Sequence, residues 1–279
     1  MSARPEILTA IRVHKRQSDK GIPFDPSPVC RAVKRALEYS TSVILAVSLA
    51  EKDLAALLTD LPPETILQTE EGAVDRALVH VLPFTSATYG RFVPALNAIV
   101  AFAHAREFRF VLFQSVEVDI GVEQANKIVE LHQDDVLVVG KAFDAHEFCQ
   151  SNSGQPNPVL LTGRTCPWNT FAMWDVGKLA RTGFLLTSET NTPPHASAIE
   201  EAPTIALHQR LFPGRSRALL VQFEPVETND DGWGTQWTDP ARIEWHARKL
   251  ASKDTSAASH IANIGLVGSM TTVEHIRMS

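Results

Sequence analysis

The sequence predicts an α/β fold in which one mixed, mostly parallel sheet is flanked by helices within a single domain. Short runs that are almost entirely Val, Ile and Leu indicate strands buried on both faces, as a parallel sheet requires. Amphipathic helical patterns alternate with these runs, which is typical of strand–helix–strand units. A chain of 279 residues buries roughly three quarters of its unfolded surface, which is enough for one large core.

The expected elements follow from these patterns in chain order. Strands are expected at 42–49, 77–84, 108–114, 135–143 and 217–223. Helices are expected at 51–61, 89–107 and 121–133, and within the segments 198–212 and 238–253. Proline fits best at the first helical position, so Pro203 and Pro240 predict where the last two helices begin.

The chain divides into three parts by regularity. Residues 1–40 show little periodicity and are expected to be an N-terminal extension packed on the core. Residues 41–145 carry the regular alternation of strands and helices. Residues 146–279 are interrupted by long polar segments rich in Pro and Gly, which are often functional loops.

Composition and missing motifs exclude several classes of protein. A net charge of −6 without clustered Lys and Arg disfavours nucleic-acid binding. Three cysteines without CxxC spacing disfavour a disulfide framework and a thiolate zinc site. The sequence shows neither a signal peptide nor a transmembrane run, so we expect a cytoplasmic protein. A P-loop, a Rossmann glycine fingerprint, GxSxG and HExxH are also missing.

An acidic pair follows the strand expected at 108–114. In "FRFVLFQSVEVD", Glu117 and Asp119 would share a face roughly 7 Å apart if the chain stays extended. Two such carboxylates repel each other, so a divalent cation, a basic side chain or solvent is expected between them. Ligands of open α/β sheets bind beyond the carboxyl ends of the strands, where this pair would lie.

The segment "YGRFVPALNAIVAFAHAREFRFVLFQSVEVD" resembles the part of GT-A-type glycosyltransferases in which a helix carrying an Asn leads into a strand that ends in a D-x-D-like motif. Glu117 departs from that pattern by one methylene. The resemblance covers about residues 41–143 and, more loosely, 160–250. It implies a Rossmann-related GT-A-like fold, with 41–145 as the nucleotide-sugar-binding half and 146–279 as the acceptor-binding and C-terminal half.

The resemblance also implies a metal-dependent transfer of a sugar from a nucleotide-sugar donor to a small-molecule or glycan acceptor. Glu117, Asp119 and His246 would hold Mn²⁺ or Mg²⁺, which neutralises the diphosphate. The alternatives are a solvated strand end for the acidic pair and a core position for His246.

The remaining site residues are placed by the same resemblance. Ser48, Arg91, Asn97 and Lys249 would contact the nucleotide sugar, although Asn97 also fits a bridge between helix and sheet. Glu201, or Glu200 beside it, would act as the base, and the alternative for this segment is a capping box that begins at Ser197. Trp168, Asn169 and Thr170 would bind the acceptor, and Trp168 could instead be a core aromatic.

Two rival functions stay open. Sugar-phosphate nucleotidyltransferases of related fold carry a glycine-rich loop with basic residues after the first strand, and "AVSLAEKDL" at 46–54 has neither glycine nor arginine. A non-catalytic GT-A-like binding protein would tolerate the Glu-for-Asp departure. The sequence indicates neither the stereochemistry of transfer nor the oligomeric state.

Overall fold

The computed structural model describes residues 6–15, 22–61, 78–85, 92–150, 155–189, 199–224, 240–266 and 270–278. The strands within these residues are β1 (Ile7–His14), β2 (Ser42–Ser48), β3 (Val79–Pro83), β4 (Phe110–Gln114), β5 (Val136–Lys141), β6 (Asn157–Leu160), β7 (Phe171–Asp175), β8 (Arg217–Phe223) and β9 (Thr272–Met278). The helices are α1 (Ser27–Ala36), α2 (Glu51–Asp60), α4 (Val93–Ala105), α5 (Val122–Glu130), α6 (Val176–Leu179), the 3₁₀ turn η3 (Leu186–Glu189), α7 (Glu201–Leu211) and α8 (Pro240–Asn263).

The strands of the described residues form one sheet in the order β3-β2-β1-β4-β7-β5-β8-β9-β6. The first four of these strands are parallel, and β5, β8 and β9 are parallel to one another. β7 lies antiparallel between β4 and β5, while β6 is an antiparallel edge strand. This arrangement confirms the predicted mixed, mostly parallel sheet flanked by helices.

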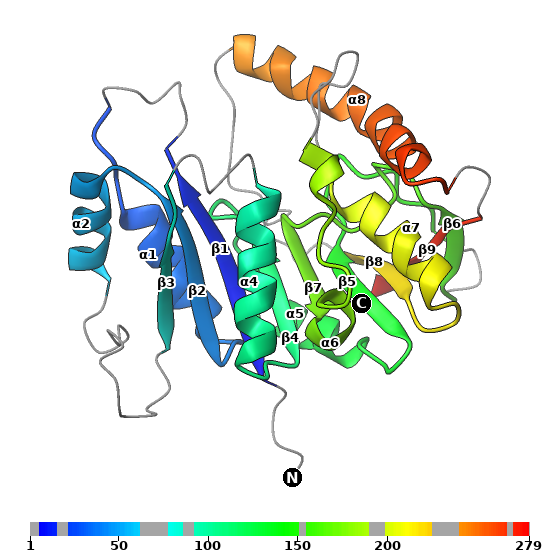
Figure 1. The fold of residues 1–279 in the computed structure, drawn as a ribbon, viewed down its shortest axis with the longest axis horizontal. Coiled ribbons are helices and arrows are strands. Elements are labelled where there is room, and N and C mark those ends of the chain that lie inside the picture. Colours follow the sequence, from blue (N-terminus) through cyan, green and yellow to red (C-terminus); the bar gives the residue numbers. More distant parts are fainter. Residues whose placement is uncertain are drawn as a thin grey trace.

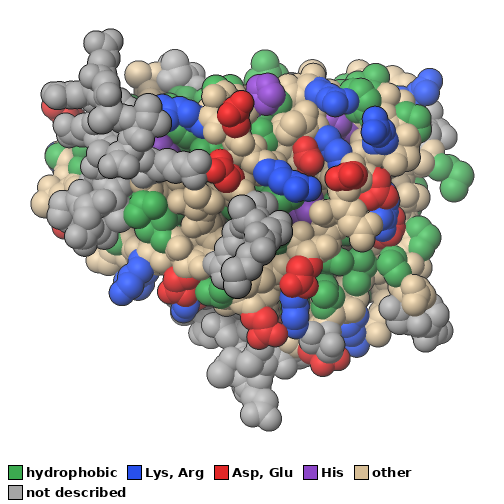
Figure 2. Space-filling model, turned by 90° about the horizontal axis from the view of Figure 1, so that it is seen from below, with side chains coloured by type: hydrophobic (Ala, Val, Ile, Leu, Met, Phe, Trp, Pro, Cys, Tyr) green, Lys and Arg blue, Asp and Glu red, His purple; other side chains and the backbone are tan. Residues whose placement is uncertain are grey.

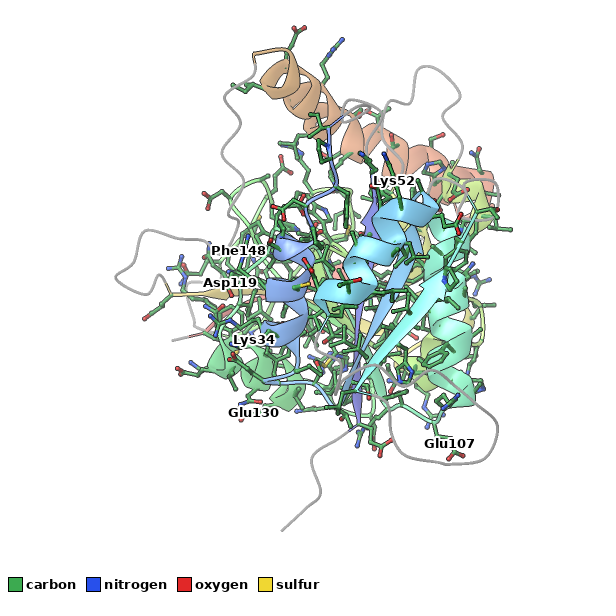
Figure 3. The ribbon with its side chains drawn as sticks, turned by 90° about the vertical axis from the view of Figure 1, so that its left-hand side faces the viewer. Lys34, Lys52, Glu107, Asp119, Glu130 and Phe148 are labelled. Atoms are coloured by element: carbon green, nitrogen blue, oxygen red, sulfur yellow. The ribbon has the colours of Figure 1, made fainter. Side chains whose placement is uncertain are left out.

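Helices cover both faces of the sheet (Figure 1). α1 and α5 lie on one face, and α4, α6 and α7 lie on the other, as the view along the sheet also shows (Figure 3). Strands β2, β4 and β5 are buried along nearly their whole length because helices cover both of their faces, which explains their unbroken apolar sequences. α8 crosses the top of the molecule in the view of Figure 1. Among the described residues, we find no helix with the length and apolar character needed to cross a membrane.

The prediction that residues 1–40 form an extension packed on the core is wrong. Residues 7–14 are strand β1, which lies in the interior of the sheet between β2 and β4. Six of its eight residues are buried, five of them in the consecutive run from Ile7 to Ile11. Residues 27–36 form helix α1, whose apolar side packs Val29 and Val33 into the core.

The second half departs from the expected elements in three places. Trp174 lies in strand β7, which is not among the expected strands. α7 begins at Glu201, so Pro203 lies within the first turn rather than at the first position, which is tolerated because first-turn N–H groups lack helical partners. α8 begins at Pro240 as predicted and continues to Asn263, ten residues beyond the expected end at 253.

Candidate functional site

Four polar side chains from distant parts of the sequence meet where the central strands end. Arg12 lies one residue beyond Ile11, which pairs with Gln114, the last residue of β4. Gln114 also pairs with Phe171, so Asn169, two residues before Phe171, lies beyond the same edge. Asn169 contacts Glu200 and Glu201 at the start of α7. The carboxyl edge of the sheet, where α/β proteins bind ligands, therefore carries a buried pair of carboxylates.

Asn169 holds both carboxylates of this pair. Its backbone N–H donates to Glu201 Oε1 at 2.6 Å, and its side-chain Nδ2 donates to Glu200 Oε1 at 2.9 Å. Its Oδ1 accepts a hydrogen bond from Trp174 Nε1 at 2.8 Å. All three interactions are buried, so the expected acceptor-binding role of Asn169 is replaced by one of holding the acidic pair.

Burial and the adjacent Glu201 raise the pKa of Glu200 to about 7, from its ordinary value of 4.5. The positive charge of Arg12 and the hydrogen bond from Asn169 act in the opposite direction. Two carboxylates in one desolvated site cannot both ionise easily, so a proton is retained on the pair near neutral pH. A carboxyl with such a pKa can both accept and release a proton under physiological conditions.

Trp168 does not present a ring to a ligand. His146 stacks on it with 3.6 Å between ring centroids, and Lys253 Nζ lies 3.8 Å from the ring centroid. Two groups so close to one centroid would overlap on the same face, so they cover opposite faces of the indole. The prediction that Trp168 stacks against an acceptor sugar is therefore wrong, and the alternative of a core aromatic is correct. Thr170 is partly exposed, and its carbonyl oxygen accepts the N–H of Ser115.

The acidic pair Glu117 and Asp119 does not lie on an extended strand. β4 ends at Gln114, and the chain then turns, with the Val118 N–H donating to the Ser115 carbonyl. Gln114 fixes this turn because its Nε2 donates to the Val118 carbonyl. The alternation that would have placed both carboxylates on one face is therefore broken.

Asp119 lies beside helix α1 instead (Figure 3). Its Oδ1 accepts a hydrogen bond from Arg35 Nε at 3.0 Å, and its side chain is 69% exposed. From the sequence, a divalent cation, a basic side chain or solvent is expected beside the acidic pair, and the partner of Asp119 is a basic side chain, that of Arg35. Glu117 is half-buried in the turn.

The residues described here do not fit the expected Mn²⁺ or Mg²⁺. A hard cation needs several oxygen ligands that converge, and Asp119 is engaged by Arg35. The described part of the chain contains no group of three or more His, Cys, Asp or Glu side chains arranged to hold a metal. The side chain of His246, the third predicted ligand, lies outside the described residues.

The predicted donor-binding residues have separate outcomes. Ser48 ends β2 opposite His14, so it lies at the carboxyl edge as expected. Asn97 is a bridge, because its Nδ2 donates to the Phe184 carbonyl at 2.9 Å and its Oδ1 accepts the Phe184 N–H at 2.7 Å. Arg91 and the side chain of Lys249 lie outside the described residues.

Sequence reasoning missed Arg12. The run "ILTAIRVH" contains five apolar residues among its first seven, which is a strand signal, and the Arg within it would then lie near a strand end. Lys15, just after the same strand, forms an ion pair with Asp53 of α2 at 3.4 Å. The β1 strand thus brings positive charge to the edge that carries the carboxylates.

A separate cavity of about 540 Å³ opens at the opposite, amino edge of the sheet. Its lining includes His104, Glu107 and Arg109, which are exposed, and Asp175 at the end of β7. On the face seen from below, acidic and basic side chains are interspersed and neither sign forms a large patch (Figure 2). This cavity offers no buried titrating group comparable to Glu200, so we place the candidate site at the carboxyl edge.

No family model and no curated protein matches the sequence. Solved structures that are similar include 4-diphosphocytidyl-2C-methyl-D-erythritol synthase from Anaerococcus prevotii, with 9% identity, a TM-score of 0.44, and 87% of this chain and 95% of that chain covered. A protein described as a nucleotide-diphospho-sugar transferase from Desulfovibrio desulfuricans has 11% identity, a TM-score of 0.43 and coverages of 90% and 99%. Mannose-1-phosphate geranyltransferase from Thermus thermophilus has 13% identity, a TM-score of 0.37 and coverages of 98% and 74%. The proposals below rest on the geometry of this chain and not on these similarities.

Proposed function

We propose that this protein is a transferase that moves a sugar from a nucleotide-sugar donor to a hydroxyl acceptor, with Glu200 as the general base. The observation that supports this proposal is a buried carboxyl whose pKa of about 7 fits proton transfer, at the carboxyl edge of a mostly parallel sheet.

In the proposed reaction, ionised Glu200 accepts the proton of the acceptor hydroxyl. The hydroxyl oxygen then bonds to the anomeric carbon while the bond from that carbon to the diphosphate oxygen breaks, and the nucleoside diphosphate leaves with the electron pair. Glu200 Oε1 is engaged by Asn169, so Oε2 is the oxygen assigned to the acceptor. Arg12, on the neighbouring strand end, supplies positive charge for the diphosphate.

A second candidate is a sugar-phosphate nucleotidyltransferase, and one observation favours it. The first strand of the sheet is β1, so the loop to compare with those enzymes is the segment after His14 and not residues 46–54. That segment reads "KRQSDKG" and contains the arginine and the glycine that the other segment lacks. Residues 16–21 lie outside the described part of the structure.

Product analysis separates the two reactions. The purified protein is incubated with a panel of nucleotide sugars, and released nucleoside diphosphate is measured by chromatography, with water as the acceptor when no other is supplied. A parallel set contains nucleoside triphosphates with sugar 1-phosphates, and released pyrophosphate is measured. We expect nucleoside diphosphate from at least one nucleotide sugar, and a loss of about 100-fold or more in Glu200→Gln.

The matched control is Glu130→Gln, which removes an exposed carboxylate on α5 and should leave the rate unchanged (Figure 3). Pyrophosphate release with no nucleoside diphosphate release would replace the glycosyl-transfer proposal by the second candidate. Full activity in Glu200→Gln would overturn the assignment of the base. Absence of both products across the panel would count against both transfer reactions.

A further inference from the structure

We propose that Asn169, held in place by Trp174, is the positioning residue that lets Glu200, the carboxyl of the pair that carries the exchangeable proton, ionise in its buried site. The catalytic consequence rests on the proposed function, whereas the placement of the proton stands on geometry alone. Three hydrogen bonds link Trp174, Asn169 and the two carboxylates.

Trp174 fixes the orientation of the Asn169 amide. The indole Nε1–H is a donor only, and it lies 2.8 Å from Oδ1 of Asn169 in the fully buried core. The oxygen of the amide must therefore face Trp174, and the NH₂ group must face Glu200, whose Oε1 lies 2.9 Å away. Trp174 is itself held by an edge-on contact with Phe184, with 5.1 Å between centroids.

Glu201 has the better environment for a negative charge. It accepts the backbone N–H of Asn169 at 2.6 Å, and a backbone donor cannot rotate away. It is also the first residue of α7, and the positive end of a helix dipole favours an anion there. Glu200 receives only a side-chain N–H, which depends on the orientation set by Trp174.

The proton retained by the pair is therefore assigned to Glu200. Glu200 and Glu201 are buried, with 6% and 5% of the residue surface exposed, so bulk water does not screen one carboxyl from the other. The raised pKa of Glu200 has the direction that this assignment requires. The side-chain N–H of Asn169 favours the ionised form of Glu200 and so limits how far burial and the adjacent Glu201 raise the pKa of Glu200.

The test is a carboxyl titration by NMR of the full chain labelled with ¹³C at the glutamate side-chain carboxyl carbon. The resonance missing from Glu200→Gln identifies Glu200. We expect Glu200 to titrate near neutral pH. In Trp174→Phe, which removes the N–H but keeps a buried ring, the Glu200 midpoint should move upward by about one pH unit, since a hydrogen bond to the anion is weakened.

Asn97→Ala is the matched control. Its amide also bridges two elements, through the backbone of Phe184, but it touches neither carboxylate. This variant should lose stability and leave the Glu200 midpoint unchanged. Asn169→Ala should move the midpoint in the same direction as Trp174→Phe; if it does not fold, Trp174→Phe decides alone.

An unchanged Glu200 midpoint in Trp174→Phe, or a Glu200 resonance that does not titrate in the neutral range, would overturn the inference. If glycosyl transfer is detected, the pH dependence of kcat should move with the NMR midpoint in Trp174→Phe, which a purely structural role would not produce. If no transfer is detected, the proposed function fails while the titration still decides where the proton resides.

Discussion

Replacing Glu200 by Gln should stabilise the protein at neutral and alkaline pH and not in acid. Gln is nearly the same size, keeps an oxygen for the Asn169 N–H and carries no charge, so it mimics the protonated carboxyl. In the wild type, ionising Glu200 means placing a second negative charge in a buried site beside Glu201.

The size of the effect follows from linkage between proton binding and folding. The pKa of Glu200 is about 7 in the folded chain and 4.5 when unperturbed, so the folded state binds this proton more tightly than the unfolded state. The stability that the proton contributes is complete below pH 4.5 and is lost as the pH rises through 7. The difference amounts to about 3 kcal/mol in the free energy of unfolding.

The assay is urea unfolding of both proteins at pH 4, 5, 6, 7 and 8, with the free energy of unfolding obtained by linear extrapolation. Comparing the variant with the wild type at each pH cancels the titration of all other groups. The gain in Glu200→Gln should be close to zero at pH 4, rise between pH 4.5 and 7 and level off near 3 kcal/mol at pH 8.

Glu130→Gln serves as the control, because this exposed side chain leaves no buried charge to remove (Figure 3). Its difference from the wild type should stay small and constant with pH. A gain in Glu200→Gln that is the same at pH 4 and pH 8, or a loss at pH 8, would refute the claim that Glu200 is a buried acid with a raised pKa.

Three further substitutions test a strained backbone angle, a close packing contact and an ion pair. Glu107→Gly should raise the free energy of unfolding by about 1 kcal/mol, because Glu107 follows the C-cap of α4 with φ of 60°, where a side chain is strained. Gly163→Ala should lower it by about 2 kcal/mol, because the new Cβ would lie 2.3 Å from the Lys253 carbonyl oxygen of α8. Arg217→Gln should lower the free energy of unfolding by about 1 kcal/mol, and by less at high salt. Arg217 donates two hydrogen bonds to the Glu274 carboxylate, and its side chain is 33% exposed, so salt screens the ion pair. Urea unfolding measures all three.

Each of these has an internal comparison. Gly121→Ala should leave the free energy of unfolding nearly unchanged, since nothing lies within 4 Å of the added Cβ. If Gly163→Ala had no larger effect than Gly121→Ala, the close contact between Gly163 and α8 would be contradicted. Gly214→Ala should destabilise the protein, because Gly214 has a φ of +74° although nothing lies within 4 Å of the added Cβ. This substitution adds a side chain at a positive φ, whereas Glu107→Gly removes one. A cost for Arg217→Gln that does not change with salt would contradict its electrostatic origin.

The elements that the sequence predicted are those whose burial leaves a mark on local composition. Strands β2, β4 and β5 were predicted because helices on both faces require unbroken apolar runs. β1 was missed because Thr9 and Arg12 interrupt its run. Thr9 is nevertheless fully buried, and its hydroxyl is satisfied by the hydroxyl of Ser40, 31 residues away, which no local pattern shows.

The candidate site was predicted in part for the same reason. Glu200 and Glu201 were proposed from a resemblance and lie at the carboxyl edge beside Asn169. Asp119 was expected to extend a strand, but the chain turns after Gln114, which also accepts a hydrogen bond from Tyr39 Oη at 2.5 Å, and Asp119 meets Arg35. Tyr39 is 75 residues from Gln114 in sequence, and Arg35 is 84 residues from Asp119. The residues around the acidic motif therefore give no indication of either contact.

The central place of β1 bears on how the chain is made. Its two edges pair with β2 and with β4, and β4 begins about 100 residues after β1 begins. At ribosomal speeds of about 5–20 residues per second, one edge of the earliest strand stays uncovered for roughly 5–20 seconds of synthesis. During that interval an apolar strand with free backbone groups is a target for aggregation and for chaperones. Synonymous codons that slow translation between residues 50 and 110 would lengthen this exposure and lower the soluble yield.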